Sequence, residues 1–231
     1  MLSDQDRKTI EEAVRAAELR TTGEIYTVVA RESSDYREVP IAWAAVAALS
    51  APAVLLAAGI HVTVPDLFGD QSWSAAQLGA AAEGAARAAL TGAILLQGVL
   101  FIGIAFLVSL PPLRRFLTPG PLKRERVRRR AQEQFLAKNL QATRERTGVL
   151  IYVSVKERMA ELIADEGIDA KVDRKVWDDA MKALIDGFRR KTPGAGFAAA
   201  IGQCGDILAQ HFPARSHDNP NELPDSVVVL P

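Results

Sequence analysis

The sequence contains a single cysteine, Cys204, among its 231 residues. One cysteine cannot form an internal disulfide, and it excludes a structural zinc site built from several thiolates. The chain also lacks an excess of charge of either sign, because 28 Lys and Arg residues balance 28 Asp and Glu residues. A basic excess is the usual electrostatic footprint of nucleic-acid-binding proteins, so we expect no nucleic-acid partner.

Charge is nearly absent from residues 41–113. This segment holds one basic residue, Arg87, and three acidic residues, Asp66, Asp70 and Glu83. The remaining 158 residues carry 27 basic and 25 acidic side chains, so that about a third of them are charged. This partition is typical of a membrane segment joined to a soluble domain, and it argues against an ordinary cytosolic enzyme.

Two uncharged runs in this segment are long enough to cross a bilayer. A hydrocarbon core about 30 Å thick is crossed by roughly 20 apolar helical residues. We therefore predict transmembrane helices at 41–64 and 88–113, joined by an external loop at 65–87. Core helices of a soluble domain seldom contain more than 20 uncharged residues in a row, which favours the membrane interpretation over a buried-core one.

Lys and Arg cluster directly after the second run. Residues 114–130 carry eight basic residues and one acidic residue, whereas the loop at 65–87 carries three acidic residues and one basic residue. The positive-inside rule places the loop outside and both flanking segments in the cytoplasm. The first 20 residues are charged throughout, so we expect no secretory signal peptide. The basic cluster either attracts anionic lipid headgroups or serves as a topology signal on a solvated helix face.

The flanking segments, 1–40 and 114–231, together predict one α/β domain that the hairpin interrupts. Their 158 residues are enough for a single hydrophobic core. A first helix begins after Ser3, whose side chain can cap it, and Asp6 occupies the capping-box position.

Strands are predicted at 24–30 and 149–155, separated by the hairpin and by a helix from about 122 to 144. Strand, helix and strand form a β–α–β crossover, in which the two strands are parallel. A tight polar turn then leads to a third strand at 159–165, antiparallel to the second. The sequence therefore predicts a mixed sheet.

Two helices and an extended tail complete the predicted domain. The first helix carries an apolar stripe from Val176 to Phe188, and the last helix begins at the turn formed by residues 192–194. The proline-containing tail, from Pro213 to Pro231, is expected to be extended and to pack over the sheet.

Four acidic side chains occur within nine positions, where a predicted strand ends and a helix begins: Asp165, Glu166, Asp169 and Asp173. Calcium and magnesium bind several oxygen ligands at about 2.0–2.6 Å, which a flexible acidic loop can supply. The loop lacks the twelve-residue EF-hand spacing. In the alternative interpretation Asp173 caps the following helix and the other three acids are solvated.

Other patterns are weaker indications of chemistry. Residues 216–218 spell Ser-His-Asp, but neighbours in a loop cannot adopt the geometry of a catalytic triad. The Gly194-x-Gly196 pattern follows a turn rather than a strand, which favours helix packing over dinucleotide binding. Cys204 falls on an apolar helix stripe and is expected to be a core residue.

Several motifs taken together resemble the TPM domain family, in particular its bacterial membrane-protein branch. They are the TGEI strand (Thr22–Ile25), TRERTGVLIYVS (Thr143–Ser154), IADEGID (Ile163–Asp169), the following Trp-containing helix, GxGFAAAI (Gly194–Ile201) and NELPD (Asn221–Asp225). The resemblance implies a three-layer α/β/α sandwich, here interrupted by a two-helix transmembrane hairpin. It also implies residence in a bacterial inner membrane, and phosphatase activity and calcium binding have been proposed for some relatives.

Because the residues form no convincing catalytic set, we expect a non-catalytic module. It would bind, assemble or maintain another membrane component, with a membrane protein as its partner and the soluble domain in the cytoplasm. The alternative is a phosphatase that uses calcium or magnesium held by the acidic loop at 165–173.

Overall fold

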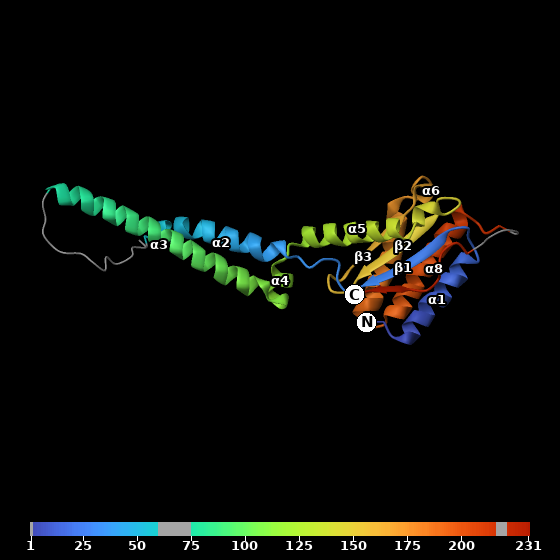
Figure 1. Ribbon diagram of the computed structural model, residues 1–231. Coiled ribbons are helices and arrows are strands. Elements are labelled where there is room, and N and C mark those ends of the chain that lie inside the picture. Colours follow the sequence, from blue (N-terminus) through green and yellow to red (C-terminus); the bar gives the residue numbers. More distant parts are fainter. Residues whose placement is uncertain (1, 60–74, 216–220) are drawn as a thin grey trace. The chain divides into compact units, whose positions relative to one another are not determined.

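The computed structural model describes residues 2–59, 75–215 and 221–231. The chain folds into two units (Figure 1). One consists of Tyr36–Pro119, and the other combines Met1–Asp35 with Gly120–Pro231. The second unit is therefore a domain whose chain is interrupted by the first unit, as the charge partition predicts.

A four-stranded mixed sheet, in the order β3-β2-β1-β4, forms the centre of the interrupted domain. Its strands are β1 (Glu24–Ala30), β2 (Gly148–Ser154), β3 (Met159–Ala164) and β4 (Val228–Leu230). β1 pairs in parallel with β2 and with β4, and β3 pairs antiparallel with β2. The predicted parallel crossover from β1 to β2 is confirmed.

Helices cover both faces of this sheet, which confirms the three-layer α/β/α class (Figure 1). One face packs against α1 (Asp4–Glu18), α7 (Asp178–Arg189) and α8 (Pro193–His211), and the other against α5 (Gly120–Ala137). Every residue of β1 and β2 is buried, because their side chains alternate between two helix-covered faces. Ile25 and Val29, for example, belong to the core on the α8 side, whereas Tyr26 and Val28 belong to the core on the α5 side.

The first helix begins as predicted. The Ser3 side chain accepts a hydrogen bond from the Asp6 backbone at 3.1 Å, and the Asp6 carboxylate accepts from the Ser3 backbone at 2.9 Å. This reciprocal capping box satisfies two of the free N–H groups at the helix start.

Several predicted boundaries differ from those observed. The helix expected to reach residue 144 ends at Ala137, because Asn139 adopts a left-handed conformation (φ 55°) before the short helix η1 (Leu140–Ala142). Val176 is not part of the apolar stripe: it is 46% exposed and lies in a short 3-10 helix, η2 (Arg174–Trp177), before α7 begins. The tail does not merely cover the sheet, because its residues 228–230 join the sheet as β4.

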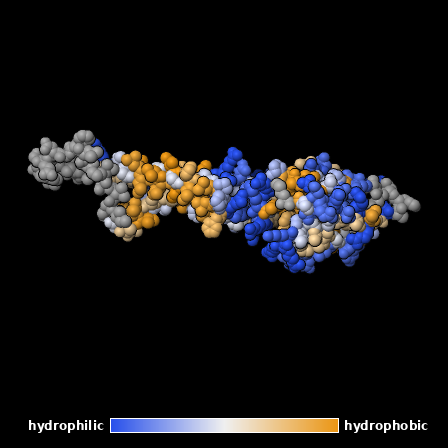
Figure 2. All heavy atoms as spheres, turned by 90° about the horizontal axis from the view of Figure 1, so that it is seen from below, coloured by the Kyte–Doolittle hydropathy of each residue, from blue (hydrophilic) through white to orange (hydrophobic). Residues whose placement is uncertain are grey.

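The other unit consists of α2 (Glu38–Ala57), α3 (Ala75–Ser109) and α4 (Pro111–Leu117). Helix α2 packs against α3. Helix α2 and the Arg87–Ser109 part of α3 are long and apolar enough to cross a membrane. Many of their large apolar side chains are exposed, and Figure 2 shows them as a hydrophobic surface on these helices. They include Ile41, Val46, Leu49, Val54, Leu90, Ile94, Val99, Ile102 and Phe106.

Two glycines allow α7 and α8 to approach closely. A Cβ atom on Gly196 would lie 2.8 Å from the Gly187 Cα and 3.0 Å from the Leu184 carbonyl oxygen. Both contacts are with backbone, which cannot move aside without separating the helices. A Cβ atom on Gly202, on the same helix, would meet no atom within 4 Å.

Gly196→Ala is therefore expected to lower the free energy of unfolding by about 1–3 kcal/mol. The matched substitution Gly202→Ala should raise it by roughly 0.5–1 kcal/mol, because alanine favours helix without any clash at that position. Thermal or denaturant unfolding of the full chain in detergent would measure both. Equal effects of the two substitutions would contradict the close helix approach.

Candidate functional site

The acidic loop is the site that the sequence favours, and the structure gives its first acid a structural role. Asp165 is 3% exposed and caps α6 (Glu166–Asp169), accepting a hydrogen bond from the Glu166 backbone at 2.7 Å. Its two carboxylate oxygens also accept from the Arg146 guanidinium at 2.9 and 3.0 Å. This bidentate pairing raises the pKa of Arg146. Asp165 is thus fully engaged by a helix end and a cation.

The other three acids serve different neighbours. Glu166 is 86% exposed and contacts Arg146 at 3.2 Å, while Asp173 caps η2 by accepting from the Lys175 backbone at 3.0 Å, as the alternative interpretation predicts. Asp169 lines a cavity described below. Within the described residues, no three His, Cys, Asp or Glu side chains gather as metal ligands would. The calcium or magnesium site stays a prediction that this geometry does not support.

Two other sequence candidates have packing roles. Cys204 is fully buried in the core, as predicted, and burial raises the pKa of its thiol to about 12. Gly194 and Gly196 lie at the buried start of α8, where the Gly194 N–H donates to the Asp6 carboxylate at 3.0 Å. The tripeptide at 216–218 lies outside the described residues.

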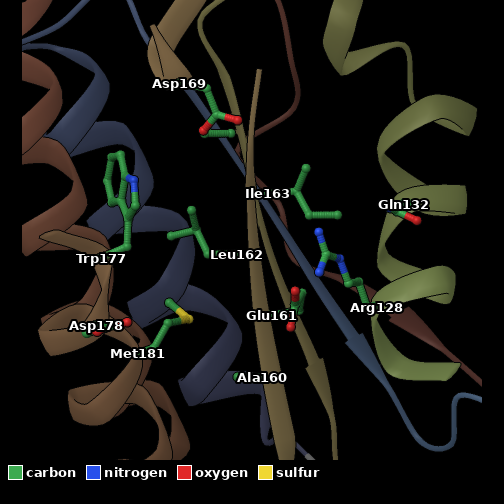
Figure 3. A pocket seen from close by; sticks show the side chains of 11 residues that line it. Arg128, Gln132, Ala160, Glu161, Leu162, Ile163, Asp169, Trp177, Asp178 and Met181 are labelled. Atoms are coloured by element: carbon green, nitrogen blue, oxygen red, sulfur yellow. The ribbon is translucent and has the colours of Figure 1, made fainter. Parts of the chain in front are cut away.

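The outer edge of β3 is an unpaired edge of the sheet. This strand pairs with β2 on one side, and no strand of the described chain pairs with its other side. A cavity of about 320 Å³ follows β3, between α5 and the η2–α7 segment (Figure 3). Its lining residues are Arg128, Gln132, Ala160, Glu161, Leu162, Ile163, Ala164, Asp169, Trp177, Asp178 and Met181.

Strand alternation divides the β3 side chains between the two walls. Leu162, like its neighbours two positions away, packs with the core on the α7 side, and Ile163 packs with the core on the α5 side. Glu161 shares the α5 side with Ile163 because residues two apart point to the same face. Figure 3 shows the Arg128 side chain extending from α5 toward β3, with its guanidinium group between the levels of Ile163 and Glu161.

The direction of the β3 backbone follows from one hydrogen bond. The Asp165 N–H donates to the Gly148 carbonyl oxygen at 2.9 Å, so the backbone polar groups at position 165 point toward β2. In an antiparallel pair these directions alternate, so the backbone groups of residues 159, 161 and 163 also point toward β2. Those of Ala160, Leu162 and Ala164 point outward along the free edge.

The groove also contains a buried donor without an acceptor. Trp177 is 3% exposed, and its indole N–H has no hydrogen-bond partner among the described residues. A buried polar group without a partner costs about 1–3 kcal/mol. The helical walls differ in charge as well, with Arg128 on α5 and Asp169 and Asp178 on the other side, while Glu161 of β3 itself lies on the α5 side. The groove is thus suited to a segment that supplies backbone hydrogen bonds and charged side chains.

Residues 115–207 match the family model described as the TPM domain. The chain carries a TPM domain. The match contains β2, β3, the acidic loop and the whole groove, but not the N-terminal part of the domain or β4.

The fold of a solved structure is similar to that of this chain. It is the NMR structure of the BA42 protein from the psychrophilic bacterium Bizionia argentinensis, with a TM-score of 0.55 and 18% sequence identity. The similarity covers 99% of this chain and 95% of that chain, and at this identity it concerns the fold alone. No curated protein matches the chain.

The sequence patterns did not indicate a cluster of carboxylates that joins both ends of the interrupted α/β domain. Glu18, at the end of α1, is buried and accepts a hydrogen bond from the Ile25 backbone at 2.8 Å. Glu24 accepts from the Leu223 backbone at 3.1 Å, which ties the NELPD motif to the start of β1. Burial raises the pKa of Glu18 to about 8, with smaller contributions from the nearby carboxylates of Glu24 and Asp225. The motif was visible in the sequence, but its contact with Glu18 was not.

Glu18 should make stability depend on pH. Between pH 4.5 and about 8 this carboxyl is ionised in the unfolded chain and protonated in the folded chain, so folding takes up a proton. The free energy of unfolding should therefore fall as pH rises through this range, by a few kcal/mol, since one pKa unit corresponds to about 1.4 kcal/mol. Glu18→Gln, which keeps the acceptor and cannot ionise, should reduce this slope and stabilise the protein at pH 8. Thermal unfolding of the full chain at pH 5 to 8 measures the slope.

The exposed Glu166→Gln variant is the matched control and should keep the slope of the unsubstituted protein, because its side chain is 86% exposed. The same slope in all three proteins would mean that Glu18 is ionised in the folded state.

Proposed function

We propose that this chain is a membrane-anchored, non-catalytic interaction module whose TPM domain binds an extended protein segment at the β3 edge. The observation that carries the proposal is the free edge itself, six residues long and lying in a groove with walls of opposite charge. Adding a strand to such an edge is a common mode of peptide recognition, in which backbone hydrogen bonds supply affinity and side-chain pockets supply specificity.

The sequence of β3 supports binding rather than protection. Proteins usually block free strand edges with charged side chains, above all lysine, with proline or with a bulge, since an open edge pairs with other chains. The β3 sequence, Met-Ala-Glu-Leu-Ile-Ala, contains one charge, Glu161, whose backbone groups point toward β2, and neither lysine nor proline, and it pairs with β2 residue by residue without a bulge. The edge is therefore open to an incoming strand.

The polar side chains of the groove lining are Arg128, Gln132, Glu161, Asp169 and Asp178. These residues offer carboxylates but no hydroxyl, thiol, amine or imidazole group, and no second catalytic group is paired with a carboxylate in any hydrogen bond described above. Two helices apolar enough to cross a membrane would hold the domain at a bilayer. A bacterial inner membrane with the TPM domain on the cytoplasmic side agrees with the basic cluster at 114–130.

A proline at position 160 should abolish binding while preserving the sheet. The Ala160 N–H points away from β2, so Ala160→Pro removes a donor from the free edge alone. We expect a photo-crosslinking amino acid in place of Gln132, which lines the groove from α5, to form a protein adduct in intact membranes, and Ala160→Pro to reduce that adduct at least about fivefold. The yield of the adduct is read on a denaturing gel.

Val229→Pro is the matched control at the opposite edge of the sheet. The Leu230 carbonyl accepts from the Arg31 backbone, so the backbone groups of Val229 point away from β1. This variant should keep the adduct. An adduct that survives Ala160→Pro, or its absence from the parent protein, would contradict binding at β3. Phosphate-ester turnover by the purified chain, lost in the double variant Asp165→Asn, Glu166→Gln, would contradict the non-catalytic role.

The membrane topology has its own test. A reporter enzyme that is active only outside the cytoplasm should be active when fused at Gly69 and inactive when fused after Pro231. The physical reason is the charge asymmetry across the hairpin, with eight basic residues and one acidic residue in 114–130 against one and three in 65–87. An active C-terminal fusion would place the TPM domain outside the cytoplasm.

A further inference from the structure

We propose that the strand bound at the β3 edge is β3 of a second copy of this chain, paired antiparallel across a two-fold axis. This inference rests on the proposed function, since it names the occupant of the same groove. It is argued from the register of the free edge and from the charges beside it.

Backbone direction restricts the register of such a pair. Two outward-facing residues must lie opposite each other to exchange both backbone hydrogen bonds. A register centred on Leu162 places Leu162 opposite Leu162 of the second copy, and Ala160 opposite Ala164 in both directions. This register forms three hydrogen-bonded pairs, whereas one centred on Glu161 forms two and sets the Glu161 carboxylates directly against each other. Like charges in that position destabilise a sheet.

The Leu162 register also matches the charge on the α5 side of the groove. It places Glu161 of the second copy opposite Ile163, on the face where Arg128 extends toward β3 (Figure 3). Directly opposite residues have Cβ atoms about 4.5–5.5 Å apart, so the incoming carboxylate would lie within reach of the Arg128 guanidinium. The two-fold axis produces the same contact a second time, between Glu161 of the first copy and Arg128 of the second.

The α7 side of the groove is apolar at the position where the second copy would place its Leu162. Leu162 packs on the α7 side, next to the wall formed by Trp177 and Met181. The two Leu162 side chains would meet there and remove each other from water. The β3 strand of a second copy thus matches the free edge in length. It brings Glu161 to the side that carries Arg128, and Leu162 to the apolar side.

Exchange of the two charges between chains gives a test that an intrachain contact cannot mimic. Glu161→Arg alone places a second guanidinium beside Arg128 of the other chain, and Arg128→Glu alone places two carboxylates together. Each single variant of the full chain in detergent should therefore dimerise at least about tenfold more weakly than the parent protein. Mixing the two variants pairs unlike charges across the interface and should restore the dimer to within about threefold.

Dimerisation is measured by light scattering on a size-exclusion column and, for the mixture, by co-purification of differently tagged chains. Recovery on mixing shows at the same time that both variants are folded. A parent protein that stays monomeric at about 50 µM would overturn the proposal, and so would a dimer that the variants leave unchanged or that mixing does not restore. If the Gln132 photo-adduct then contains a different protein and is lost in Ala160→Pro, the proposed function stands without the second copy.

Discussion

The parallel pairing of β1 with β2 is the contact on which the rest of the domain depends. It joins residues that are far apart in the chain, from Glu24 with Gly148 to Ala30 with Ser154. Parallel neighbours need a crossover connection, so the chain must leave one end of β1 and enter β2 at the other. The crossover here contains α5 and the complete apolar unit. Such an insertion is tolerated because the entropic cost of closing a loop grows only with the logarithm of its length.

The same pairing determines which edges of the sheet stay open. The hairpin after β2 places β3 on one side of the central pair, and β4 fills the other side with three residues. The β3 edge lies between two helices because α5 covers one face of the sheet and α7 the other. A groove beside β3 is therefore a consequence of the three-layer fold, while its charges and its indole N–H, which has no partner among the described residues, come from individual side chains.

Patterns that depend on neighbouring residues could be predicted from the sequence, and contacts between distant segments could not. The capping box at Ser3 and the fully buried β1 and β2 leave clear local signals. β4 leaves only a short signal, the β-branched residues 227–229, and its pairing with β1, about 200 positions earlier, is not encoded locally. Likewise, the acidic loop was recognised by residue type, but the partner of Asp165 is Arg146 from the segment before β2. The open edge itself is a property of strand order, which local patterning does not encode.

Helix α5 connects the two halves of the proposed role. Its basic residues follow the second apolar helix in the sequence, and they are the main support for the proposed topology. Its apolar face, formed by Val127, Ala131 and Phe135, packs on the sheet and so fixes the rotation of the helix. That rotation brings Arg128 beside β3, where it lines the groove. At least one charge of the basic cluster therefore lies on the domain surface beside β3. The proposed topology alone would be satisfied by lysine or arginine at any position of the cluster, whereas the proposed binding at β3 requires a cation at position 128.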